Sequence, residues 1–227
     1  MLKSLAYGVI ATSVLALFGT AHAATLSVSF DGGPSAGSTV YDGTNGTGSL
    51  PSLSYADGTT AQFTGGAGLA TGNSSGLFAA PFTGGAQETS QYFYAPTRGQ
   101  ITFDLGKPTT KVGFLWGSVD TEATRNLVSL YSGKDGTGSL LGQFNGSDVK
   151  AALTDLQAGS WYDKGSVYAN ITSDAGNIGS IVFSDTAGGN SFEFDKVSAV
   201  PLPGALPLFG TALFGLGMLA RRRRVVA

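Results

Sequence analysis

Frequent turn sequences constrain the fold of this chain more than any other feature. The chain has 35 glycines among 227 residues, and many of them cluster with Ser, Thr, Asn and Asp. The tripeptide Asp-Gly-Thr occurs at residues 42–44, 57–59 and 135–137. Glycine reaches positive φ without steric cost and aspartate hydrogen-bonds its own backbone, so these tripeptides predict tight turns. Their unequal spacing argues against a repeat architecture.

Short segments rich in β-branched and aromatic residues lie between these turns, and several alternate apolar and polar residues as strands do. The predicted strands span residues 25–30, 91–95, 100–105, 111–119, 126–132, 139–144, 166–172, 178–184 and 191–200. The segment 133–138 has the composition of a hairpin turn between its neighbours. Nine strands with dense turns predict an all-β fold, an antiparallel β-sandwich.

The alternation also assigns faces to several strands. One face is expected to carry Leu26, Val28 and Phe30 in the first strand, and Ile101, Phe103 and Leu105 in the third. In the last strand we expect Phe192 and Phe194 on one face, with Glu193, Asp195 and Val197 on the other.

Two regions depart from the strand pattern. Residues 147–153 predict a short helix capped by Ser147. The glycine-rich residues 31–90 predict either long loops over one end of the sandwich or edge strands.

The first 23 residues predict a secretory signal peptide. Lys3 supplies the positive n-region, residues 5–18 form an apolar h-region, and Ala21-His22-Ala23 is a small-residue cleavage site. We therefore expect cleavage after Ala23. The alternative is an uncleaved N-terminal anchor.

The last 28 residues combine a proline-marked linker at 200–203, an apolar span at 204–220 and four arginines, Arg221 to Arg224. As a helix at about 1.5 Å per residue, the span would cover about 25 Å, which is short for a hydrocarbon core of about 30 Å. The arginines should stay on the cytoplasmic side. Residues 24–199 are therefore predicted to form an exported domain that a transmembrane helix anchors.

Charge and composition exclude several functions for this exported domain. It carries 15 acidic and eight basic residues, a formal charge of −7, so it should repel nucleic acid. The chain has no cysteine, and its one histidine, His22, lies in the predicted signal peptide. Catalysis by Ser-His-Asp or Cys-His groups and zinc sites built on imidazole or thiolate are thereby excluded from the domain. Carboxylate chemistry and oxygen-only metal binding remain.

The C-terminal tail resembles the PEP-CTERM sorting signal of Gram-negative bacteria. The matching parts are Val200-Pro201-Leu202-Pro203 as the motif, the span at 204–220 and the cluster Arg221, Arg222, Arg223 and Arg224. Leu202 replaces the glutamate of the name-giving motif. The resemblance implies recognition by an exosortase, a membrane cysteine protease, followed by removal of the span and delivery to the cell surface or extracellular matrix. An ordinary membrane anchor with a prolyl hinge is the alternative.

The exported segment is similar to a group of exosortase-dependent surface proteins with a jelly-roll-like domain. The similarity rests on Gly117-Ser118-Val119-Asp120 and on residues 190–197. It implies a non-enzymatic protein with a structural or adhesive role. The alternative is a carbohydrate-binding module, or a weak glycosidase, that acts on exopolysaccharide.

Three sets of side chains are candidates for a site. Glu193 and Asp195 should share a strand face, and with Asp31 they could hold a structural Ca²⁺; a solvated acidic face is the alternative. Asp120 and Glu122 could act as acid and base, although a polar loop with Arg125 as counter-ion is the simpler interpretation. Six aromatic residues could stack on sugars or pack in the core: Tyr92, Phe93, Tyr94, Trp116, Trp161 and Tyr162. Trp161 and Tyr162 are the pair expected near the surface. No catalytic residue and no cofactor other than this calcium is predicted.

Overall fold

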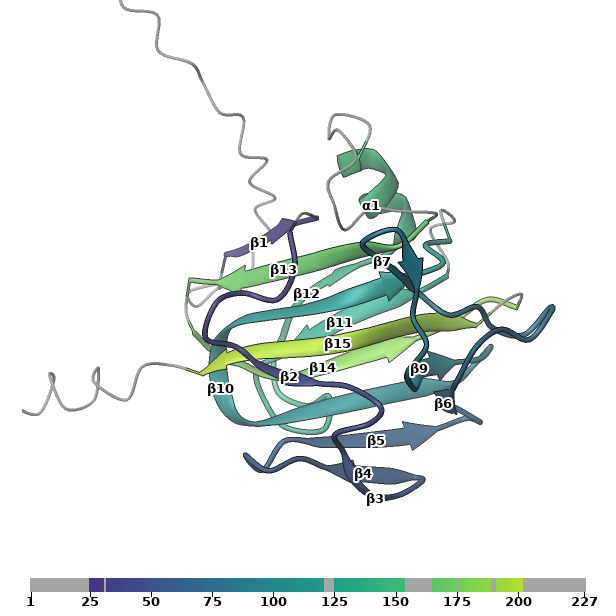
Figure 1. Ribbon diagram of the computed structural model, residues 1–227. Helices are drawn as coiled ribbons and strands as arrows, with labels where there is room; N and C mark the ends of the chain where they lie inside the picture. Colours follow the sequence, from purple (N-terminus) through teal and green to yellow (C-terminus); the bar gives the residue numbers. More distant parts are fainter. Residues whose placement is uncertain are drawn as a thin grey trace, which may run out of the picture.

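The part of the chain that the structure describes folds into antiparallel β-sheet with one short helix (Figure 1). The computed structural model describes residues 25–30, 32–120, 125–153, 165–174, 176–188 and 191–201. The strands are β1 (Leu26–Ser29), β2 (Thr39–Tyr41), β3 (Thr47–Ser49), β4 (Ser52–Ser54), β5 (Thr60–Thr64), β6 (Gly68–Ala70), β7 (Phe82–Thr83), β8 (Ala86–Gln87), β9 (Tyr92–Ala95), β10 (Gln100–Gly117), β11 (Leu127–Tyr131), β12 (Leu140–Phe144), β13 (Val167–Ser173), β14 (Ile178–Ser184) and β15 (Phe192–Pro201). The predicted all-β class is confirmed.

The long strand β10 belongs to two layers of sheet. Its residues 100–104 pair with β14 and β5, whereas residues 111–117 pair with β13 and β15. Between these halves the strand bends, and Gly106 has φ +65°. Figure 1 shows β10 turning from one layer into the other. The sequence predicted two separate strands here, at 100–105 and 111–119, and the structure joins them into one.

Each half of β10 organises one layer. The first layer runs β12-β11-β14-β10-β5-β4-β3. In the second layer β1 and β13 lie on one side of β10 and β15 on the other, and β15 pairs in turn with β9 and β2. Strand β6 continues the second layer beyond β9.

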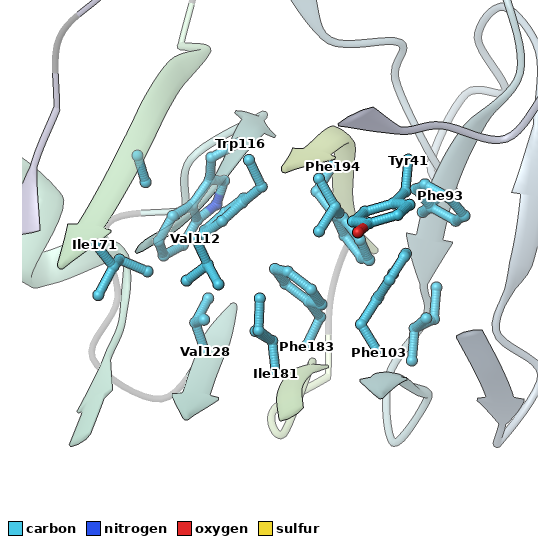
Figure 2. Packing of buried hydrophobic residues seen from close by; sticks show 14 of the residues in the cluster. Tyr41, Phe93, Phe103, Val112, Trp116, Val128, Ile171, Ile181, Phe183 and Phe194 are labelled. Atoms are coloured by element: carbon cyan, nitrogen blue, oxygen red, sulfur yellow. The ribbon is translucent and has the colours of Figure 1, made fainter. Parts of the chain in front are cut away.

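The hydrophobic core fills the space between the two layers (Figure 2). The rings of Phe183 from β14 and Phe194 from β15 stack across it with centroids 3.9 Å apart. Ile101, Phe103 and Leu105 all lie in this core, as their alternation predicted. Aromatic rings supply much of the contact area, which helps a domain without disulfides to hold its fold.

Several local predictions are confirmed and others need correction. Strands β11 and β12 form the predicted antiparallel hairpin. The predicted helix is α1 (Gly146–Leu153), but Asn145 caps it, because the backbone N–H of Ser147 donates to its Oδ1 at 2.9 Å. Val28 is 38% exposed, so it does not share the buried environment of Phe30. Residues 31–90 contribute short strands to both layers and to the β7–β8 hairpin.

Both ends of the described domain lie at the same end of the second layer. Leu26 pairs with Ser173 at the start of β1, and Pro201 pairs with Thr109 at the end of β15. Lys111 pairs with both Thr172 and Val200, which places these positions side by side. The connections to the predicted signal peptide and to the predicted tail therefore leave from one end of the domain.

The predicted signal peptide and the predicted span at 204–220 lie outside the described residues. Within the described ranges, no helix is long and apolar enough to cross a membrane.

Candidate functional site

Two carboxylates lie on the outer side of the second layer, on its central strand β15. Glu193 pairs with Gly117 of β10 and Tyr94 of β9, and Asp195 pairs with Leu115 of β10. Their neighbours Phe192 and Phe194 belong to the core, so the two acidic side chains share the opposite face as predicted. Glu193 is only 1% exposed and Asp195 is fully buried, so this is not the solvated face considered as the alternative.

An irregularity at Lys196 reverses the alternation of β15. Lys196 has φ +48°, and the register of β15 against β10 shifts between Leu115 and Gly113. Asp195 pairs with Leu115 and Ser198 pairs with Gly113, so β15 uses one more residue than β10 over this stretch. Such a bulge turns the following side chains to the other face. Val197 consequently joins the core, which corrects its predicted place beside Glu193 and Asp195.

Residues 77–90, here called the cover segment, lie over this acidic face and include the β7–β8 hairpin. The backbone N–H of Ser191 donates to the carbonyl of Leu77 at 3.1 Å, and that of Phe82 donates to Ser166 Oγ at 2.9 Å. Pro81 packs against the backbone of Gly117, where an added Cβ would lie 2.7 Å from the proline ring. This cover explains why the two carboxylates are buried.

Glu193 is directly bonded to the cover segment. The backbone N–H of Ala79 donates to its Oε1 at 3.2 Å. Its Oε2 is buried and has no hydrogen-bond partner among the described residues. Burial raises the pKa of Glu193 to about 8, and the negative charge of Asp120 adds to this effect. At neutral pH the side chain is therefore mostly protonated.

Asp195 lies in a similar environment. Neither of its carboxylate oxygens has a hydrogen-bond partner within the described ranges. Burial raises the pKa of Asp195 to about 7; Lys196 opposes this shift, whereas Asp42 and Glu88 add to it. Burial therefore favours the protonated form of Asp195 relative to an exposed aspartate.

An ion pair joins the bulge to the cover segment. Lys196 Nζ lies 2.5 Å from Glu88 Oε2 and donates more weakly to Thr83 Oγ1, at 3.4 Å. Burial alone would raise the pKa of Glu88, but hydrogen bonds from Lys196 and Ser90 outweigh it and lower the pKa. At neutral pH Glu88 is therefore ionised, whereas Glu193 is mostly protonated. The sequence does not indicate this pair, because a contact between positions 88 and 196 leaves no local pattern.

The burial of the pair limits its chemistry. A carboxyl group that is at most 1% exposed has no surface on which a polysaccharide could dock in this conformation. General acid catalysis needs the acid within hydrogen-bond reach of the substrate. In this conformation Glu193 and Asp195 contact only the fold itself, and Glu193 accepts a hydrogen bond from the cover segment.

Two of the three residues of the predicted calcium site, Glu193 and Asp195, are among the described residues. Asp31 lies outside the described residues, so its distance from Glu193 and Asp195 is not defined. Among the described side chains, no group of three or more His, Cys, Asp or Glu is placed to hold a metal ion. The buried oxygens of Glu193 and Asp195 suit a cation by their chemistry, and calcium binding stays a prediction.

In the other carboxylate candidate, Asp120 lies beside Arg125. Arg125 Nη1 lies 3.8 Å from Asp120 Oδ2, and Arg125 also donates to the carbonyl of Gly188 at 2.8 Å. This arrangement confirms Arg125 as the counter-ion of Asp120. Glu122 lies outside the described residues.

The aromatic candidates divide into core and surface. Phe93 and Trp116 lie in the core, and the buried Tyr92 donates its hydroxyl to the carbonyl of Gly72 at 2.6 Å. Tyr94 is partly exposed and packs against Phe78 with ring centroids 5.0 Å apart. Trp161 and Tyr162, the predicted sugar-stacking pair, lie outside the described residues.

The first two residues of the predicted sorting motif belong to the domain itself. Val200 and Pro201 are the last residues of β15 and pair with Lys111 and Thr109 of β10. The Thr109 hydroxyl donates to the carbonyl of Val200. Leu202, Pro203 and the arginine cluster 221–224 lie outside the described residues.

Comparison with known proteins gives little further information. No protein family matches the chain, and no curated protein is similar to it. A solved structure, the catalytic domain of a GH87 alpha-1,3-glucanase in complex with tetrasaccharides, aligns with 19% identity and a TM-score of 0.39. The alignment covers 75% of this chain but only 29% of that one. A likeness this distant supports no conclusion about fold or activity.

Proposed function

We propose that this chain is an exported, non-enzymatic surface protein with a jelly-roll-like domain, which an exosortase sorts by its C-terminal tail. In this proposal the domain has a structural or adhesive role at the cell surface or in the extracellular matrix of a Gram-negative bacterium. The signal-peptide pattern at 1–23 and the motif, span and arginine cluster at 200–227 support export and sorting.

The observation that carries the proposal is the position of β15. This strand pairs with β10 on one side and with β9 and β2 on the other, and it leads directly into the predicted tail. A tail joined to a central strand attaches the whole domain to whatever holds the tail. The burial of Glu193 and Asp195 agrees with a non-enzymatic role, because these raised-pKa carboxyls are covered.

Processing in the presence and absence of an exosortase tests the sorting proposal. The full chain is expressed in a Gram-negative host that has an exosortase and in the same host without it. Intact mass should show loss of residues 1–23 in both, and loss of the residues from 204 onward only where the enzyme is present. Deletion of residues 221–224 should leave a longer, membrane-retained product.

A proline substitution supplies the matched control. Pro203→Ala should slow processing, whereas Pro108→Ala, at an exposed proline in the bend of β10, should not. A mature protein that keeps residues 204–227 despite an active exosortase would refute the sorting proposal.

Carbohydrate binding is a second candidate, and the partly exposed Tyr94–Phe78 pair favours it. Aromatic faces with few nearby charges suit neutral sugars. Retention of residues 24–201 on exopolysaccharide that is lost with Tyr94→Ala would support this function. Tyr131→Ala, at a partly exposed tyrosine of the first layer, is the matched control. Release of sugar by the domain would contradict its non-enzymatic role.

A further inference from the structure

The cover segment belongs to the long connection between β6 and β9, residues 71–91 (Figure 1). The two ends of this connection are adjacent, because Ala70 of β6 pairs with Tyr92 of β9. The chain therefore leaves the second layer and returns to it at one place. A loop whose ends are joined in this way can swing away from a surface while the strands that carry it stay paired.

Hydrogen bonds within the connection make it a unit. Asn73 Oδ1 accepts from the backbone N–H of Ala80 at 2.8 Å and from the side-chain amide of Gln87 at 2.7 Å. The side-chain amide of Asn73 donates in turn to Gln87 Oε1 at 3.1 Å. The backbone N–H of Glu88 donates to the carbonyl of Pro81 at 2.8 Å. These bonds join the two arms of the connection and involve no group of the second layer, so they can persist when the connection moves.

The apolar contacts of the connection are separate from the main core. Phe78 and Ala80 pack with Tyr92 and Tyr94 of β9 in a small cluster of their own. The Phe78 ring has its centroid 5.0 Å from that of Tyr94 and 6.3 Å from that of Tyr92. The core between the two layers includes no residue of the connection. Movement of the connection would therefore expose the small cluster and leave the main core closed.

Polar contacts hold the cover segment against the second layer. The backbone N–H groups of Ala79 and Phe82 donate to side chains of that layer. The ion pair between Glu88 Oε2 and Lys196 Nζ, 2.5 Å apart, is the contact that joins opposite charges. Breaking these contacts and the small cluster costs less free energy than unfolding, which breaks the main core as well.

We propose that the cover segment is a hinged lid. It swings as one unit about the paired ends of β6 and β9, the main core stays folded, and the ion pair of Glu88 and Lys196 holds it closed. Opening of the lid uncovers the carboxyl group of Glu193 and removes Phe78 from Tyr94. The closed lid thus conceals a face that carries a carboxyl group beside tyrosine rings.

Amide hydrogen exchange, followed residue by residue by NMR on the purified full chain, separates lid opening from unfolding. The N–H groups of Ala79 and Phe82 bond to the second layer, whereas those of Ala80 and Glu88 bond within the connection. After correction for intrinsic rates, Ala79 and Phe82 should exchange faster than Ala80 and Glu88, and faster than the amides of β14 in the core.

Two results would overturn the lid. Equal protection of these four N–H groups and of β14 would mean that the cover segment opens only when the domain unfolds. Exchange at Ala80 and Glu88 as fast as at Ala79 and Phe82, with β14 slower, would mean that the connection unravels and does not swing as a unit.

A variant of Glu88 tests what holds the lid closed. Glu88→Gln removes the negative charge that faces Lys196, so exchange at Ala79 and Phe82 should become faster by about 2- to 10-fold. Lys134→Gln is the matched control. It removes the other described lysine–carboxylate pair, in which Lys134 Nζ lies 3.8 Å from an Asp104 oxygen, away from the lid. Exchange that Glu88→Gln changes no more than Lys134→Gln would refute the role of the ion pair.

Discussion

Glu193 and Asp195 differ from ordinary acidic residues because the fold removes them from water. Burial raises the pKa of Glu193 to about 8 and that of Asp195 to about 7. In the folded protein both groups therefore hold protons at a pH where the unfolded chain has released them. The folded state is favoured at low pH, and this advantage is lost as pH rises through the folded pKa values.

The pH dependence of stability should show this effect. Between pH 5 and 8 the free energy of unfolding should fall, with each group contributing up to about 1.4 kcal/mol per pH unit. Glu193→Gln should flatten the profile and be more stable than the wild type at pH 8, because an amide does not ionise. Asp135→Asn, in an exposed turn, is the control and should follow the wild type. Urea titrations at several pH values measure the difference, and a wild-type profile that rises over this range would contradict it.

Calcium would reverse this pH dependence if it binds between the carboxylates. A ligand that binds only the folded state raises its stability, and calcium requires the ionised groups. The melting temperature at pH 8 should then rise with Ca²⁺ and fall with a chelator, and Asp195→Asn should remove the response. An unchanged melting temperature upon chelation would eliminate the calcium prediction.

At the scale of elements, the cover segment packs closely on β10 at Gly117. A side chain at this position would meet the ring of Pro81 at 2.7 Å. The sequence shows a glycine at the end of a predicted strand, but it does not show what lies over it. The contact forms because residues distant in the chain meet across the second layer.

Gly117→Ala should therefore destabilise the domain by about 1–3 kcal/mol, the usual cost of overpacking. Gly188→Ala is the matched control, because nothing lies within 4 Å of an added Cβ there and its φ is not in the left-handed region. Thermal or urea unfolding of both variants measures the effect. Equal stability would mean that the cover segment is not packed tightly on β10.

Strands and turns were predicted correctly where the sequence pattern that specifies them lies within one short segment. The hairpin at 126–144 and strand β14 carry their own turn and alternation signals, and both formed as predicted. The bulge at Lys196 was not predictable, because a lysine with positive φ has no sequence signature. It arises where β15 must match the register of β10, and it moved Val197 into the core.

At the scale of the whole molecule, β15 contributes to the hydrophobic core and also leads into the predicted sorting tail. It is the last strand of the described chain, yet it lies in the middle of the second layer. Its formation closes the core, since Phe192, Phe194, Val197 and Ala199 all contribute to it.

A chain of residues 24–201 should therefore fold cooperatively, whereas one of residues 24–195 should not. Removal of the last six residues deletes Val197 and Ala199 from the core and leaves β2 without its partner. Circular dichroism and a cooperative melting transition distinguish the two chains. A stable, cooperative 24–195 domain would show that the end of β15 is dispensable.

Local chemistry was enough to predict the all-β class, and the composition by itself leaves no His or Cys chemistry in residues 24–199; the exported topology stays a prediction from the terminal patterns. These features follow from turn residues, alternation, composition and terminal charge patterns, which are all written within short stretches of chain. The burial of Glu193 and Asp195, the Lys196–Glu88 pair and the pairing of Val200 with β10 required the folded chain. Each depends on segments tens of residues apart, and only the packing of the second layer brings them together.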